Sequence, residues 1–153
     1  MMSDQRDLSG VIFTLNCAVI CFRSAYRKWC ASQKVNYHEM LIFYSLSETP
    51  DCTQTDICNS YMLPKQTIHN TVKRLQRQGY LTLEQAAGSQ KEKYLRLTPE
   101  GQVYADRIVR PLREAEIRAV KQTGMDKVRL FADSFIDYSK ILNRVMNPED
   151  EEV

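Results

Sequence analysis

Apolar residues recur every three to four positions near the N-terminus, which is the spacing of an amphipathic helix. They are Leu8, Ile12, Leu15, Val19, Phe22, Tyr26 and Trp29. A second apolar group, Phe13, Cys17, Ile20 and Cys21, projects roughly to the opposite side of the same predicted helix. A helix that is apolar on two sides must be covered on two sides, so we expect a partner subunit to supply one cover.

The C-terminal third predicts two more long helices. The first runs from about Pro99 to Gln122, and the second is stopped by Asn147-Pro148. The apolar positions of the second again follow the helical period: Val128, Phe131, Phe135, Tyr138, Leu142 and Val145. Long helices are therefore expected at both ends of the chain, over residues 7–33 and 100–147.

Three shorter helices are predicted between these segments. The first reaches about Ser47, the second reaches about Tyr61, and the third carries Ile68, Val72 and Leu75 toward the core. Their predicted starts are Asn36 as an N-cap, Thr53 as an N-cap with Asp56 three positions on, and Pro64 at a first helical position.

Gly79 is the expected C-cap of the third short helix, and the period of the pattern changes after it. Apolar and polar residues alternate over Tyr80–Leu83 and again over Tyr94–Leu97, with a polar loop at Ala86–Lys91 between them. This pattern predicts a β-hairpin. A short helix, a turn, a basic helix and a hairpin follow one another in a winged helix-turn-helix, here assigned to residues 35–99.

Charge is concentrated in this middle segment. The whole chain of 153 residues carries a formal charge of only +2, but Pro64–Arg96 holds seven basic and two acidic residues. Such a local excess indicates a surface that faces a polyanion. The length of the chain predicts a single domain over residues 1–153. The acidic residues near its end predict a frayed tail over residues 148–153.

The sequence lacks the motifs that are typical of several other classes of protein. The five cysteines are odd in number and form no C-x-x-C pair, which favours a reducing cytoplasm over a disulfide framework or a zinc ribbon. There is no H-E-x-x-H, G-x-S-x-G, P-loop or G-x-G-x-x-G motif. We therefore expect no enzyme, no catalytic residue, no metal and no cofactor. Polar residues interrupt Leu8–Phe22, so no membrane partner is expected either.

With these elements in this order, the chain resembles the MarR-type (multiple-antibiotic-resistance regulator) family of bacterial transcription factors. The most specific fragment is Leu97-Thr98-Pro99-Glu100-Gly101, where a strand leads directly into a helix. The other matching fragments, in the same order and spacing, are Thr53-Gln54-Thr55-Asp56-Ile57, Leu63-Pro64-Lys65-Gln66-Thr67-Ile68, Val72-Lys73-Arg74-Leu75 and Gly79-Tyr80-Leu81. The resemblance implies a mainly α fold with a small β-hairpin wing, in which the long terminal helices form a homodimer.

The resemblance also implies binding to double-stranded DNA at a pseudo-palindromic operator. If Ile68, Val72 and Leu75 point inward, the outer face of their helix is left with base-edge readers such as Gln66 and Asn70 and with phosphate contacts. In the wing, Ser89-Gln90-Lys91 replaces the Asp-x-Arg usual in the family, and Asn70 stands where the family often has Arg. The predicted DNA contacts are Lys65, Gln66, Thr67, His69, Asn70, Lys73, Arg74, Arg77, Lys91 and Lys93.

The family resemblance leaves the regulatory signal open. A repressor released by a small ligand is the leading expectation, with a candidate pocket formed by Tyr26, Trp29, Tyr37, Tyr44 and Tyr104. An oxidant sensed by Cys17 or Cys21 is one alternative, because some members of the family use a cysteine in this helix. Another is a winged helix that binds protein instead of DNA, which neutralising Lys65, Lys73 and Lys91 would distinguish through the salt dependence of binding.

Overall fold

A computed structural model of the chain describes residues 2–85 and 92–148, with side chains from residue 7 onward. Its elements are α1 (Met2–Ser32), α2 (Tyr37–Glu48), α3 (Gln54–Tyr61), α4 (Lys65–Arg77), β1 (Leu81–Gln85), β2 (Lys93–Leu97), α5 (Pro99–Thr123) and α6 (Met125–Met146). The mainly α class, with one two-stranded hairpin and long helices at both ends, is confirmed. The chain divides into two compact units, Met1–Val109 and Arg110–Val153.

The helices of the first unit begin where their capping residues predict. The Asn36 side chain accepts hydrogen bonds from the backbone N–H groups of His38 and Glu39 at the start of α2. Thr53 and Asp56 form a reciprocal capping box at the start of α3. Pro64 is the N-cap of α4 and not its first helical residue, because its carbonyl already accepts the first intrahelical bonds.

The end of α4 explains why glycine stands at position 79. Gln78 is the C-cap, and Gly79 follows it with φ of +77°, a conformation that costs other residues a steric penalty. The N–H of Tyr80 bonds to the carbonyl of Leu75, and the N–H of Gly79 bonds to that of Gln76. These two bonds make a Schellman motif, which ends the helix and directs the chain into the hairpin.

The strand-to-helix fragment at residues 97–101 has a clear structural basis. The Thr98 hydroxyl donates to the carbonyl of Gly79 and accepts from the N–H of Gly101, so it fastens the end of α4 to the start of α5. A Cβ at Gly101 would collide with the backbone of Tyr80. Threonine and glycine are therefore both required at these positions.

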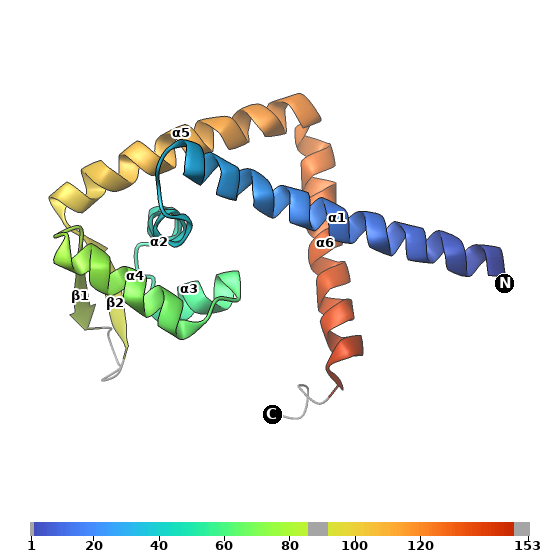
Figure 1. The fold of residues 1–153 in the computed structure, drawn as a ribbon, viewed down its shortest axis with the longest axis horizontal. Helices are drawn as coiled ribbons and strands as arrows, with labels where there is room; N and C mark the ends of the chain where they lie inside the picture. The colour runs from blue at the N-terminus through green and yellow to red at the C-terminus, as the bar shows by residue number, and fades with distance from the viewer. Residues whose placement is uncertain (1, 86–91, 149–153) are drawn as a thin grey trace. The chain divides into compact units, whose positions relative to one another are not determined.

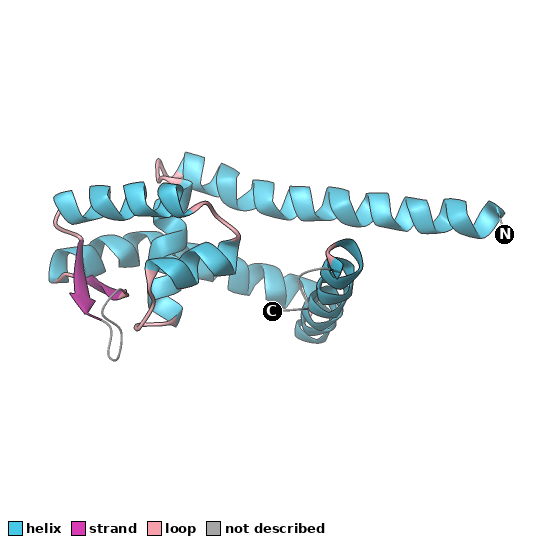
Figure 2. Cartoon of the chain, turned by 90° about the horizontal axis from the view of Figure 1, so that it is seen from below, coloured by secondary structure: helices cyan, strands magenta, loops and turns pink. Residues whose placement is uncertain are grey.

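The hairpin is antiparallel, with Leu81 opposite Leu97 and Gln85 opposite Lys93. Figure 1 shows it beside α3 and α4, and Figure 2 shows the two strands from a second side. The strands begin one residue after Tyr80 and one residue before Tyr94, slightly displaced from the predicted arms. Its inward residues Leu81 and Leu95 join a core that also contains Ile42, Phe43, Ile57, Cys58, Ile68, Val72, Leu75, Ala105 and Ile108.

The terminal helices contrast with this core. On α1, the side chains of Phe13, Ile20 and Phe22 are 70%, 67% and 62% exposed, and α6 contains no buried residue. By length and composition alone, α1 from Asp7 to Ser32 is apolar enough to cross a bilayer. A helix covered by another protein subunit passes the same test. The exposed apolar surface of α1 therefore indicates a missing cover, whatever its nature.

Candidate nucleic-acid interface

The two faces of α4 differ sharply. Ile68, Val72 and Leu75 are at most 1% exposed and fix one face of the helix to the core of the first unit. The opposite face carries the exposed side chains of Lys65, Gln66, His69, Asn70, Lys73 and Arg77, with Thr67 half-buried at its edge. A single helix thus places most of the predicted DNA contacts on one outward surface, as a recognition helix requires.

The amides of this surface are paired with each other. Gln66 Nε2 donates to Asn70 Oδ1 over 2.9 Å, one helical turn away. This bond restrains both side chains and uses neither Gln66 Oε1 nor the Asn70 amino group, which remain able to accept and to donate. Such a pair is suited to the edge of a base, which presents donors and acceptors in fixed positions.

The basic residues Lys73 and Arg77 lie toward the end of α4. Together with Gln76 they line an open hollow of about 590 Å³, and Arg77 Nε donates to the carbonyl of Lys73. Arg77 lies in the last turn of α4, where a cation interacts favourably with the carbonyl groups of the helix end. The long side chains of Lys73 and Arg77 can then reach a neighbouring phosphate.

Arg74 differs from these cations. Its Nη2 donates to Glu39 Oε2 over 2.9 Å, and its Nε is buried. Burial raises the pKa of Glu39, whereas Arg74 and the Tyr104 hydroxyl act in the opposite direction. Arg74 therefore links α4 to α2, a partner that the sequence pattern did not reveal because Glu39 lies 35 positions away. Contact between Arg74 and phosphate stays a prediction.

The described part of the wing contributes Lys93, which is exposed at the start of β2. Lys93 and Glu92 line a small hollow of about 170 Å³ with Thr53, Gln54 and Thr55 at the start of α3. The predicted contact Lys91 and the segment Ser89-Gln90-Lys91 lie outside the described residues. Lys93 is thus the one predicted wing contact whose surroundings can be stated.

Sequence reasoning missed Arg96, on β2. Its Nε donates to Glu84, its Nη1 to the carbonyl of Pro50 and its Nη2 to Asp51, over 2.6 to 2.7 Å. The hydrogen bond to Glu84, and next in size the one to Asp51, raises the pKa of the Arg96 guanidinium above its usual range. The partners lie 12 to 46 positions away in sequence, so no local pattern signals the cluster.

The five aromatic residues of the predicted effector pocket are all half-buried in the single chain. Tyr104 stacks on Tyr80 with ring centroids 4.5 Å apart, and Arg27 lies 4.7 Å from the centre of the Tyr37 ring. Other residues line the hollows along α1, at the end of α4 and at the start of α3. A pocket formed jointly by Tyr26, Trp29, Tyr37, Tyr44 and Tyr104 therefore stays a prediction.

The cysteines fall into two groups. Cys17 and Cys21 are exposed on α1, whereas Cys30, Cys52 and Cys58 are buried. Burial, together with the nearby negative charge of Asp56, raises the pKa of the Cys52 thiol to about 11, which makes it unreactive at neutral pH. Among the residues whose side chains are described, no cluster of three histidine, cysteine or acidic groups could hold a metal ion.

Comparison with known proteins agrees with this architecture. The model of the MarR family matches residues 34–92. NMB1585, a MarR family regulator from Neisseria meningitidis, is 24% identical with a TM-score of 0.78, covering 88% of this chain and 95% of its own. No curated protein sequence matches significantly.

Two further structural neighbours were solved with bound molecules. NadR, in complex with 4-hydroxyphenylacetate, has a TM-score of 0.71 at 21% identity, over 83% of this chain and 93% of its own. MepR from S. aureus, in complex with DNA, has a TM-score of 0.61 at 19% identity, over 82% and 96%. The resemblance stated from the sequence is confirmed: the chain has the winged helix-turn-helix fold of these structures, and the MarR family model matches its central part.

Proposed function

We propose that this protein is a transcriptional regulator that binds a specific double-stranded DNA sequence through the outer face of α4. The observation that carries the proposal is the division of α4 into a buried apolar face and an exposed face bearing Lys65, Gln66, Asn70 and Lys73. MepR, which shares the fold, has been solved with DNA, and this supports the same use of the fold here. Lys73 and Arg77 bind phosphates, while Gln66 and Asn70 contact base edges.

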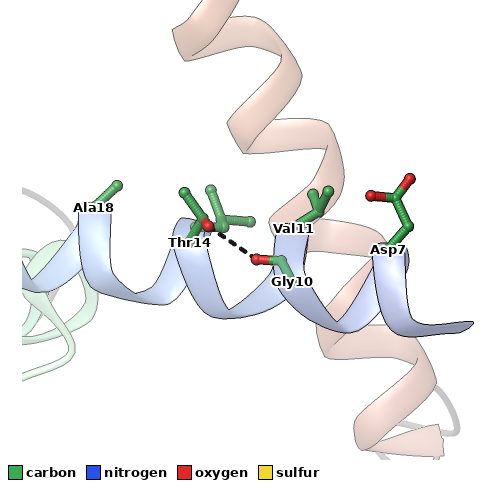
Figure 3. Close-up of a pocket in the computed structure, with 6 residues that line it drawn as sticks. Asp7, Gly10, Val11, Thr14 and Ala18 are labelled. Carbon is green, nitrogen blue, oxygen red and sulfur yellow. Dashed lines mark hydrogen bonds between the residues drawn. The ribbon is translucent and has the colours of Figure 1, made fainter.

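The protein acts as a homodimer in this proposal. Residues 7–33 and 100–147 form the interface, because α1 and α6 expose large apolar side chains that a single chain leaves in water. Asp7, Gly10, Val11, Thr14 and Ala18 lie on one side of α1 (Figure 3), and with Leu15 they line a hollow of about 570 Å³. A two-fold dimer places its two recognition helices in successive major grooves, so the operator is pseudo-palindromic.

A small aromatic molecule releases the repressor from DNA, within the cytoplasm. NadR, of the same fold, was solved with 4-hydroxyphenylacetate, and this supports an effector of that chemical class. The ligand acts by binding more tightly to a dimer whose recognition helices are wrongly spaced for the operator. Tyr26, Trp29, Tyr37, Tyr44 and Tyr104 are the residues proposed to contact it.

Oxidation is the second candidate signal, favoured by the exposure of Cys17 and Cys21 on α1. A sensing thiol must be accessible, and these two satisfy that requirement in the single chain, unlike the three buried cysteines. Peroxide treatment should then weaken operator binding in the wild type but not in a Cys17→Ser/Cys21→Ser variant. Equal loss of binding in both proteins would reject these two thiols as the sensor.

The DNA-binding proposal is tested by fluorescence anisotropy with a duplex from upstream of the protein's own gene and a scrambled duplex, each at two salt concentrations. We expect tighter binding to the native duplex and a steep fall in affinity with salt, because contacts with phosphates release counterions. Equally weak binding to both duplexes at both salts would reject autoregulation and favour the protein-binding alternative.

A further inference from the structure

Arg96 connects two parts of the lobe that are far apart in sequence. It lies near the end of β2, opposite Thr82 of β1. Its guanidinium donates to Glu84 on β1 and to Pro50 and Asp51 in the corner between α2 and α3. One side chain thus holds the hairpin and the corner that leads into the helix-turn-helix.

The strand register explains how one guanidinium reaches partners on both sides. Tyr94 and Arg96 are two residues apart on β2, so their side chains lie on the same face of the hairpin. Glu84 is paired with Tyr94 in the register and lies diagonally opposite Arg96, within reach of Nε. The Arg96 guanidinium carbon lies 5.0 Å from the centre of the Tyr94 ring, so a cation–π contact also holds the side chain.

The backbone marks the same junction. The N–H of Leu95 donates to the carbonyl of Cys52 over 2.9 Å, and Thr53 forms an isolated bridge with Tyr94. The residues that cap α3 therefore touch the strand that carries Arg96. A change in the angle of the hairpin would have to break these contacts and the bonds to Pro50 and Asp51 together.

We propose that Arg96 is a positioning residue that sets the angle of the wing against the helix-turn-helix, so that the wing and α4 contact one DNA duplex at the same time. This inference rests on the proposed DNA-binding function. The planar fork of arginine presents donors in fixed directions, and three of them are engaged here by three separate acceptors. Lysine keeps the charge but is a point donor on a flexible chain, so Arg96→Lys removes the fork alone.

The test compares two operator duplexes. The short duplex spans only the base pairs under the two recognition helices, and the long duplex extends further on both sides, where the wings reach. For the wild type we expect tighter binding and a steeper salt dependence on the long duplex, because the wings add phosphate contacts. Arg96→Lys should keep the short-duplex affinity, while its salt slope on the long duplex falls by about 1 to 2, to that of the short one.

Lys34→Arg is the matched control: it exchanges the same two cationic side chains at an exposed position between α1 and α2, outside the proposed dimer interface and the predicted DNA contacts. It should retain the advantage of the long duplex. A general loss of folding would weaken binding to both duplexes, so a loss confined to the long one distinguishes positioning from stability.

A second readout needs no DNA. Hydrogen exchange at the amide of Leu95, which donates to Cys52, should become faster in Arg96→Lys and in Asp51→Asn, while the amides of α4 keep wild-type protection. Unchanged exchange at Leu95 would overturn the inference, as would a long-duplex advantage that survives in Arg96→Lys or is missing from the wild type. Failure of the wild type to bind either duplex would instead reject the proposed function, and the inference with it.

Discussion

The helix-turn-helix lobe and the long terminal helices satisfy their apolar residues in opposite ways. In the lobe, Ile68, Val72, Leu75 and Leu95 are at most 1% exposed, so this part of the chain completes its own core. On α1, by contrast, Phe13 and Ile20 are about two-thirds exposed, and α6 has no buried residue although half of its positions are large and apolar. The lobe thus buries its apolar residues within one chain, whereas the terminal helices leave theirs exposed, which is typical of a surface that another molecule covers.

The largest expected effect concerns the terminal helices, whose exposed apolar residues we expect a second copy of the chain to cover. In a Phe13→Asp/Ile20→Asp variant, each subunit would have to bury two carboxylates in place of two apolar side chains. Because burying one such side chain contributes about 1.5–3 kcal/mol, the dissociation constant of the homodimer should rise by at least about 100-fold. Sedimentation equilibrium measures it.

The control for that variant is Asn16→Asp, which adds a charge at an exposed polar position of the same helix. It should remain dimeric. A Phe13→Asp/Ile20→Asp protein that sediments as the wild-type dimer would show that this face of α1 is not covered by a second copy.

Glycine substitutions sharpen the comparison, because the same change should have opposite signs in the two regions. A methyl group at Gly101 would meet the backbone of Tyr80, whereas nothing lies within 4 Å of the same position at Gly10. Gly101→Ala should lower the free energy of unfolding by about 1–3 kcal/mol. Gly10→Ala should raise helix stability by about 0.5–1 kcal/mol, since alanine favours a helix.

Both glycine variants are best measured by urea denaturation and circular dichroism in the Phe13→Asp/Ile20→Asp background, in which the proposed interface is weakened. A shift of the same sign for both would contradict the assignment of Gly101 to a tightly packed junction and of Gly10 to an open helix surface.

A smaller effect concerns His38 on α2. Burial, then the charges of Arg27 and Arg74, lower the pKa of His38 from its usual 6.5. The native state therefore binds this proton less readily than the unfolded state, so the free energy of unfolding decreases as the pH falls below 6.5. His38→Gln should reduce that decrease, measured by urea denaturation between pH 7.5 and about 5. If the free energy of unfolding changed with pH in the same way in the wild type and in His38→Gln, the pKa of His38 would not be lowered by folding.

Local chemistry made most of the lobe predictable from the sequence. Asn36, Thr53 with Asp56, and Gly79 act through hydrogen bonds within a few residues, so their positions alone indicated where helices begin and end. The exposed face of α4 followed from the inward period of Ile68, Val72 and Leu75. In each case, cause and consequence lie within one or two helical turns.

The missed features depend on contacts between distant segments. The predicted phosphate contact of Arg74 stays a prediction, but its ion pair with Glu39, 35 positions away, could not be read from the pattern of the basic helix. Arg96 was counted only as local charge, yet its partners Glu84 and Asp51 come together only when the hairpin meets the corner before α3. Similarly, spacing along α1 identified its apolar faces but not the molecule that covers them.

The central claim is that the outer face of α4 separates base contacts from phosphate contacts. It is tested most directly by measuring the affinity of Asn70→Ala and Lys73→Gln for a native and a scrambled operator duplex at several salt concentrations. Lys34→Gln, at an exposed position outside the proposed interface, is the control. Asn70→Ala should weaken native binding by about 1–3 kcal/mol and leave scrambled binding unchanged. Lys73→Gln should weaken both and reduce the salt slope by about 1. Wild-type affinities in both variants would contradict the claim.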